Sequence, residues 1–124
     1  MPATRLSIRL DLPNGDRIGP GKIALLEAIR DTGSIAAGAR KIEMSYRRAW
    51  LLMEEINVSL REPAVMPVTG GRQGGGARLT PTGQRIIRIY RSIEAGALKF
   101  AGDDIREVEK IVRKGRRKIS APYR

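Results

Sequence analysis

The amino-acid sequence predicts a single domain that is mainly α with small β content. Three patterns support this prediction: apolar residues recur at helical spacing, residues 6–12 alternate between apolar and polar side chains, and residues 70–76 contain five glycines. With 124 residues, 41% of them hydrophobic, the chain can bury one hydrophobic core. We place the domain at residues 1–112.

An N-terminal β-hairpin and a first helix open this domain. Residues 6–12 predict a half-buried strand, and Asn14-Gly15 is a strong turn signal that leads into a short return strand. Pro20 suits the first position of a helix, because its missing amide hydrogen is not needed there. The apolar residues that follow have helical spacing, and Gly33 is placed to end the helix.

Two further helices are predicted after Gly33. The hydroxyl of Ser34 can cap a helix that ends near Ile42, and Ser45 can cap a longer one after a brief break. The longer helix carries a stripe of apolar residues that we expect to be buried: Ala49, Met53, Ile56 and Leu60. Two capped helices would therefore meet across a tight turn.

A second hairpin and a fourth helix complete the predicted order. Residues 64–69 indicate a strand, residues 70–76 a mobile loop, and residues 78–80 an antiparallel return. Thr80-Pro81 then provides a cap and a first position for a helix. The whole order is that of a winged helix-turn-helix with an N-terminal β-hairpin and a long C-terminal helix.

The fourth helix, about 81–112, carries an apolar stripe that is longer than one small domain can cover. The stripe either packs across its own domain or forms a dimer seam with the same helix of a second subunit, and we favour the seam. A bend is expected near Gly102. The predicted dimerisation residues are Ile86, Ile89, Tyr90, Ile93 and Ala97. Residues 113–124 hold six basic residues and no acid, and predict a disordered arm.

Charge points to a polyanionic partner. Lysine and arginine number 24 against 13 acidic residues, a net charge of +11, which favours nucleic acid over an anionic membrane surface. Without Cys or His the chain cannot build a disulfide, a Cys/His zinc site or a Ser-His-Asp triad. We therefore expect that the protein is not an enzyme and that it binds no metal ion and no cofactor. The sequence shows no membrane span or signal peptide, so a cytoplasmic, nucleoid-associated protein is expected.

The candidate DNA-binding residues belong to the third helix and the glycine-rich hairpin. Tyr46, Arg47 and Arg48 open the third helix and lie outside its buried stripe, where base edges and phosphates would be met. Trp50 follows the inward-facing Ala49 and is predicted to be core. The full candidate set is Ser34, Ser45, Tyr46, Arg47, Arg48, Arg72, Gly74, Gly75 and Arg78. The alternatives are an ordinary solvated helix start and a flexible linker.

Two segments resemble a known family. Residues 33–57, GSIAAGARKIEMSYRRAWLLMEEIN, and 69–90, TGGRQGGGARLTPTGQRIIRIY, resemble the DNA-binding domain of bacterial molybdate-responsive regulators of the ModE type. They resemble more distantly the LysR-like winged helix. With the N-terminal part, the resemblance covers about residues 5–100. It implies a dimeric transcription factor on a palindromic operator, with residues 45–48 in the major groove and 70–78 as the wing.

The resemblance does not extend to a sensor. Members of that family carry C-terminal molybdate-binding domains, and no such domain is visible in this sequence, so no effector is evident. Our leading hypothesis is a sequence-specific transcriptional regulator that binds double-stranded DNA as a homodimer. The alternative is an architectural or RNA-associated basic protein that binds by charge alone. A third reading rests on Asp31-Thr32-Gly33-Ser34, the short signature of aspartic proteases, but here it falls between two helices.

Overall fold

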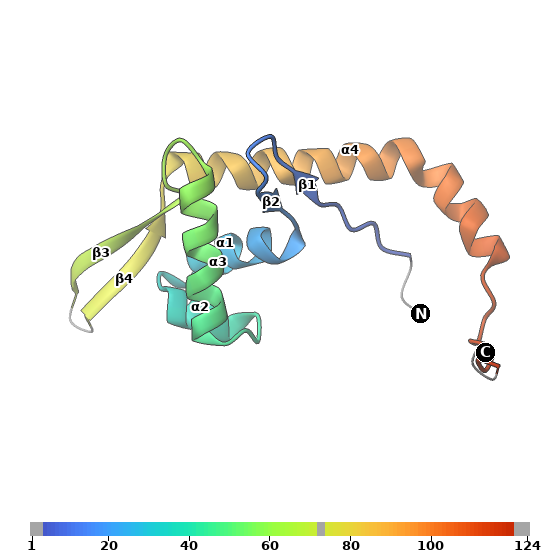
Figure 1. Ribbon diagram of the computed structural model, residues 1–124, viewed down its shortest axis with the longest axis horizontal. Coiled ribbons are helices and arrows are strands. Elements are labelled where there is room, and N and C mark those ends of the chain that lie inside the picture. Colours follow the sequence, from blue (N-terminus) through green and yellow to red (C-terminus); the bar gives the residue numbers. More distant parts are fainter. Residues whose placement is uncertain (1–3, 72–73, 121–124) are drawn as a thin grey trace.

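The computed structural model describes residues 4–71 and 74–120, and these contain four helices and two antiparallel hairpins (Figure 1). The prediction of a mainly helical chain with small β content is confirmed. The elements are β1 (Leu10–Asp11), β2 (Arg17–Ile18), α1 (Pro20–Thr32), α2 (Ile35–Lys41), α3 (Tyr46–Ser59), β3 (Val65–Gly71), β4 (Gly74–Leu79) and α4 (Pro81–Ile111).

Side-chain and backbone caps set the helix boundaries, as the sequence predicts. Gly33 adopts the left-handed conformation, with φ of 84°, and donates its amide to the Ile29 carbonyl at 2.8 Å. The hydroxyls of Ser34, Ser45 and Thr80 each accept a bond from the amide three residues later, at 3.0 to 3.1 Å. Each such cap typically contributes about 1 kcal/mol to stability.

The N-terminal hairpin is shorter than predicted. Only Leu10 and Asp11 pair with Ile18 and Arg17, although the alternating pattern begins at Leu6. Because Pro20 starts α1 two residues after Ile18, the return strand is too short to pair with the residues before Leu10. Leu6 is consequently 37% exposed instead of half-buried.

The core lies around α1, which packs against α2, α3, α4 and β4. Four of its aliphatic side chains are at most 1% exposed: Ile23, Leu25, Leu26 and Ile29. The predicted stripe of α3 is also buried at Ala49, Met53 and Ile56. Burying side chains of this kind is the main stabilising contribution to such a fold.

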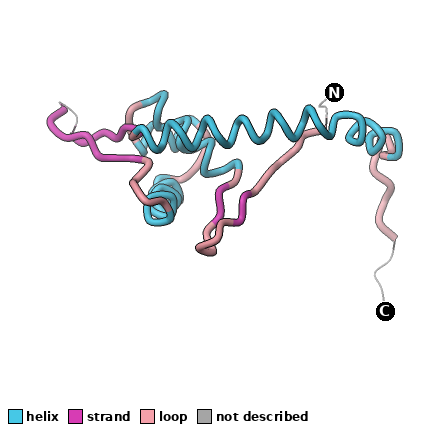
Figure 2. The backbone as a smooth tube through the Cα atoms, turned by 90° about the horizontal axis from the view of Figure 1, so that it is seen from above, coloured by secondary structure: helices cyan, strands magenta, loops and turns pink. Residues whose placement is uncertain are grey.

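The second hairpin has more strand and less loop than the sequence predicts. Val65 pairs with Leu79 and Val68 pairs with Gly76, and the strand β4 starts already at Gly74. The prediction of a loop over the whole of residues 70–76 is therefore wrong, because Gly74 to Gly76 belong to β4. In Figures 1 and 2 this hairpin projects from the helical body.

Helix α4 packs on the core through its N-terminal half. Figure 2 shows the other helices and both hairpins gathered along that half, while the C-terminal half extends beyond them, and Figure 1 shows its last turns bending away. Arg91 binds both carboxylate oxygens of Glu27 on α1, at 2.6 and 2.9 Å. Tyr90 is fully buried, and its hydroxyl donates to the Ile8 carbonyl at 2.6 Å. Tyr90 therefore belongs to the core and not to an exposed dimer stripe.

The chain after α4 has no regular secondary structure as far as residue 120, and residues 113–120 are all exposed. The helix ends at Ile111, next to the boundary predicted for the basic segment. Within the described residues, no helix has the length and hydropathy needed to cross a membrane.

Replacing Tyr90 by Phe tests the anchor between α4 and the N-terminal segment. The variant keeps the ring and loses the hydrogen bond to Ile8, so its free energy of unfolding should fall by about 1 kcal/mol at pH 8. Burial raises the pKa of the Tyr90 hydroxyl above its usual 10.0. The stabilisation is therefore complete below pH 10 and lost as the pH rises through the raised pKa.

Urea unfolding of both proteins between pH 8 and pH 11 measures this effect. The difference in free energy between the natural protein and Tyr90→Phe should narrow above pH 10. If the difference in free energy of unfolding stayed constant from pH 8 to pH 11, the Tyr90 hydroxyl would not be buried and neutral as described.

Candidate nucleic-acid interface

A tight turn fixes α3 relative to α2. The amides of Ile42 and Met44 both donate to the Ala39 carbonyl, at 3.2 and 2.8 Å. Glu43 between them has a φ of 56°, a left-handed conformation that is uncommon for a residue other than glycine. The two helices thus meet through a short, hydrogen-bonded corner, as the sequence predicts.

The first turn of α3 is exposed on the side away from the core. Ala49 is fully buried, whereas Tyr46 is 56% exposed and Arg47 and Arg48 are exposed as well. Ser45 caps this end through the Arg48 amide at 3.1 Å. The predicted residues 45–48 therefore lie together on the surface at one helix end.

The sequence-based prediction that Trp50 is core is wrong. Its side chain is 42% exposed, and the next residue, Leu51, is 48% exposed. The core touches only the face of α3 that carries Ala49, and a rotation of about 100° per residue turns Trp50 to the edge of that face. The indole is too large to be covered there.

The β3–β4 hairpin is docked on the turn between α1 and α2. The Ala77 amide donates to the Gly33 carbonyl at 2.9 Å. At the neighbouring Gly76, a Cβ atom would lie only 2.7 Å from that same carbonyl oxygen, so only glycine allows this approach. The contact joins the end of α1, the cap of α2 and the hairpin at one place.

Asn57 holds the base of the same hairpin against α3, a role that was not predicted from the sequence. Its side-chain oxygen accepts from the amides of Ala64 and Val65, at 2.8 and 3.1 Å, and its nitrogen donates to the Val65 carbonyl at 3.0 Å. A single amide side chain thus closes three hydrogen bonds to β3 and the residue before it. An asparagine two residues before the end of a helix gives no local signal of such bonds.

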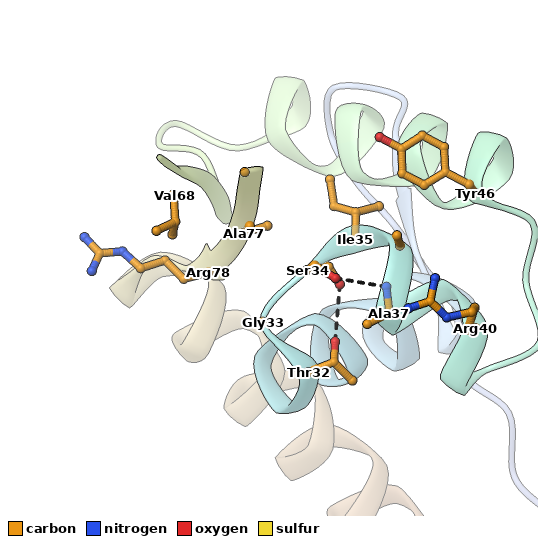
Figure 3. A pocket seen from close by; sticks show the side chains of 13 residues that line it. Thr32, Gly33, Ser34, Ile35, Ala37, Arg40, Tyr46, Val68, Ala77 and Arg78 are labelled. Carbon is orange, nitrogen blue, oxygen red and sulfur yellow. Dashed lines mark hydrogen bonds between the residues drawn. The ribbon is translucent and has the colours of Figure 1, made fainter. Parts of the chain in front are cut away.

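A hollow of about 980 Å³ lies between α2, the start of α3 and the β3–β4 hairpin. Figure 3 shows Ser34 and Ile35 between the hairpin residue Val68 and the ring of Tyr46. Arg40 also lines the hollow, and the Arg78 side chain points away from its centre in Figure 3. We refer to this space as the hairpin hollow.

The structure therefore brings the predicted residues together in two groups. Ser34, Tyr46, Gly75 and Arg78 line the hairpin hollow. Ser45, Arg47 and Arg48 border a second hollow of about 210 Å³ on α3. Gly74 begins β4, and Arg72 lies outside the described residues.

The arginines of this surface are not neutralised by the described part of the chain. Among residues 4–71 and 74–120, no ion pair involves Arg40, Arg47, Arg48 or Arg78. Guanidinium groups without carboxylate partners are available to phosphates and to base edges. The surface is therefore suited to binding a polyanion.

Asp31, by contrast, is held by cations. Its carboxylate lies 2.9 Å from Arg30 Nε and 3.3 Å from Lys41 Nζ. The hydrogen bond from Arg30, followed by that from Lys41, lowers the pKa of Asp31. A protease carboxyl pair must instead share a proton, so this environment disfavours the protease reading. The described residues also contain no group of three His, Cys, Asp or Glu residues that could hold a metal ion.

The predicted dimerisation residues divide between core and surface. Ile89 is 41% exposed and Ile93 is 39% exposed, whereas Ile86 and Ala97 are half-buried. With Tyr90 in the core, the exposed part of α4 retains an apolar face. Further exposed apolar residues follow on the same helix: Leu98, Phe100, Val108 and Ile111.

Comparison with known proteins shows similarity to bacterial regulators and molybdenum-binding proteins. The chain is 47% identical over 86 residues to the molybdenum-pterin-binding protein MopB of Rhodobacter capsulatus, which covers 69% of this chain and 32% of that protein. It is 43% identical over 96 residues to the molybdenum transport protein ModE of Azotobacter vinelandii, covering 76% and 36%.

A third relative is described by its name as a DNA-binding regulator. The chain is 40% identical over 88 residues to the DNA-binding transcriptional dual regulator ModE of Escherichia coli K12, covering 68% of this chain and 34% of that protein. The chain thus spans about a third of the length of the curated relatives it matches. No family model matches it. These relatives are named as regulators and molybdenum-binding or transport proteins, and not as enzymes.

Replacing Gly76 by Ala tests the docking of the β3–β4 hairpin. The added methyl group would meet the Gly33 carbonyl oxygen at 2.7 Å, so the hairpin must shift and the bond from Ala77 weakens. We expect a loss of about 1–3 kcal/mol in the free energy of unfolding, measured by urea denaturation. Gly75→Ala is the matched control, since its Cβ would lie 3.6 Å from the nearest atom, the Val68 carbonyl oxygen. Equal losses in the two variants would contradict the tight approach.

Proposed function

We propose that this chain is a sequence-specific DNA-binding transcriptional regulator. The observation that carries the proposal is the exposed first turn of α3, whose arginines have no ion-pair partner among the described residues, beside a docked β-hairpin. In this proposal α2, the turn and α3 act as a helix-turn-helix, and the β3–β4 hairpin acts as its wing. Helix α3 enters the major groove, where its N-terminal residues face base edges.

The two hollows suggest how the duplex would lie. With α3 in the major groove, the sugar-phosphate backbone would follow the hairpin hollow between α3 and the β3–β4 hairpin. Arg40, Gly75 and Gly76 line that path, and Arg78, whose side chain points outward from the hairpin, would reach toward the neighbouring phosphates. Contacts of this kind would position the protein, while in this proposal Arg47 reads a purine edge.

The relatives support the same function. One of them is named as a DNA-binding transcriptional regulator and another as a molybdenum transport protein. The chain spans about a third of their length, and we infer that this part carries the DNA-binding role. Their names make promoters of molybdenum-related genes the first operators to test.

We further propose that α4 pairs with its copy to form a homodimer. Ile86, Ala97 and Val108 are eleven residues apart, as are Ile89, Phe100 and Ile111. An 11-residue repeat, about 3.67 residues per turn, keeps an apolar stripe on one side of a helix. Exposed fractions of 92% at Phe100 and 82% at Ile111 leave much of that stripe uncovered in a single chain. Two copies would meet a palindrome with half-sites one helical turn, about 34 Å, apart.

Replacing both Arg47 and Arg48 by Ala tests the role of α3. A guanidinium that reads a base contributes about 1–3 kcal/mol of discrimination, so the operator dissociation constant should rise about 10- to 100-fold. Binding to random DNA should weaken less, because the other cations remain. Fluorescence anisotropy with operator and competitor DNA measures both values.

The matched control removes the same charge elsewhere. Arg61 and Arg88 are exposed and lie outside the first turn of α3, so Arg61→Ala with Arg88→Ala should change operator preference little. If the natural protein showed no preference for any sequence, the charge-only alternative would hold, for which the net charge of +11 is sufficient. Equal effects of the two double variants would argue against α3 as the reading element.

Ile93→Glu tests the proposed dimer surface. Burying a carboxylate without a partner is costly, so the dimer dissociation constant should rise at least about tenfold. Analytical ultracentrifugation over a range of concentrations measures it. Ser92→Glu adds the same charge at an exposed neighbouring position and should leave the dimer intact. A natural protein that sediments as a monomer at all concentrations would refute the surface.

A further inference from the structure

The exposed surface of α3 carries large apolar side chains as well as arginines. Binding of DNA through charge alone would not need these apolar side chains. Besides Arg47 and Arg48, this surface exposes Trp50 at 42% and Leu51 at 48%. Neither side chain belongs to the hydrophobic core, to which α3 contributes Ala49, Met53 and Ile56 from its inner face. Both side chains are therefore available for contact with a molecule that binds this side of α3.

Helical geometry places both residues within the reach of a groove. Trp50 stands one turn after Tyr46, and Leu51 one turn after Arg47, so two stripes run along the first two turns. Neighbours in one stripe are about 6 Å apart along the axis, from a rise of about 1.5 Å per residue. That distance spans about two base-pair steps of about 3.4 Å. Each apolar side chain therefore lies within two base pairs of the residue that precedes it in its stripe.

The major groove offers one prominent apolar group, the 5-methyl group of thymine. We propose that Trp50 and Leu51 contact thymine 5-methyl groups, within about two base pairs of the base that Arg47 reads. This inference rests on the proposed function. Thymine recognition at these positions would then be set by apolar contact, and purine recognition by the guanidinium group.

The surroundings favour duplex DNA over a protein partner as the occupant of this face. Arg47 and Arg48 border the same hollow as Leu51, and neither pairs with a carboxylate of the described residues. The acidic residue at the hollow, Glu55, is bound to Lys22 at 3.2 Å. The DNA major groove is bordered by anionic phosphates and also exposes apolar thymine methyl groups. A surface that combines guanidinium groups without carboxylate partners and exposed apolar side chains is complementary to such a groove.

The test removes the methyl group from the DNA and the side chain from the protein. An operator is first selected from random-sequence DNA with the natural full chain. Each thymine of a half-site is then replaced singly by deoxyuridine, which lacks only the 5-methyl group. Dissociation constants are measured for the natural protein, Trp50→Ala and Leu51→Ala. Val58→Ala is the control, because Val58 is apolar, 77% exposed and lies near the far end of α3.

At one or two thymines, deoxyuridine should weaken binding by the natural protein about fourfold, the value of one buried methyl or methylene group. At those positions the substitution should have no further effect on Trp50→Ala or Leu51→Ala, while Val58→Ala should respond as the natural protein does. Failure to select any sequence would refute the proposed function itself. A selected operator whose thymines all tolerate deoxyuridine would overturn only the methyl contact, as would equal sensitivity in every variant.

Discussion

The docking of the β3–β4 hairpin on the turn between α1 and α2 depends on one backbone contact, the bond from the Ala77 amide to the Gly33 carbonyl. Gly33 ends α1 in a left-handed conformation, and the next residue caps α2. Two consecutive residues, Gly33 and Ser34, therefore determine where α1 ends, where α2 begins and where the hairpin docks. Asn57 supplies the second attachment, from α3 to the base of the hairpin. One attachment is at the base of the hairpin and the other is further along it, at Ala77, so the hairpin cannot rotate freely about either one.

Local chemistry explains why much of this fold could be predicted from the sequence. A serine hydroxyl caps a helix by accepting a hydrogen bond from the amide three residues later, as Ser34 and Ser45 do. The left-handed conformation after α1 favours glycine, which is Gly33 here. These three roles can therefore be predicted from the sequence. Hairpin pairing depends on residues that are more distant. The return strand after Asn14-Gly15 is cut short by Pro20, and Gly74 to Gly76 are ordered as strand by pairing and by docking on Gly33.

Tertiary contacts account for what the sequence did not reveal at the candidate site. Trp50 follows a buried residue and has a large apolar side chain, yet the core covers only one side of α3, and Trp50 lies at the edge of that side, where it is 42% exposed. Asn57 has no neighbour in the sequence that identifies its partners, Ala64 and Val65, which are seven and eight residues away, just before and at the start of β3. Tyr90 likewise fits the apolar stripe of α4 by spacing, but its hydroxyl reaches Ile8 across the core.

Affinity and specificity would come from different parts of this molecule. Phosphate attraction depends on the number of cations near the duplex and ignores sequence, and the exposed, basic residues 113–120 can contribute to it without a defined geometry. Base reading would require a helix backbone held at a fixed position, and the Ser45 cap and the buried face of α3 provide this. If α3 binds DNA as proposed, its capped helix is already formed, so little of its interaction free energy would be lost to ordering of the backbone. In the proposed function, substitutions in α3 would therefore alter discrimination between sequences, while general attraction to DNA, to which the basic residues 113–120 contribute, would stay nearly constant.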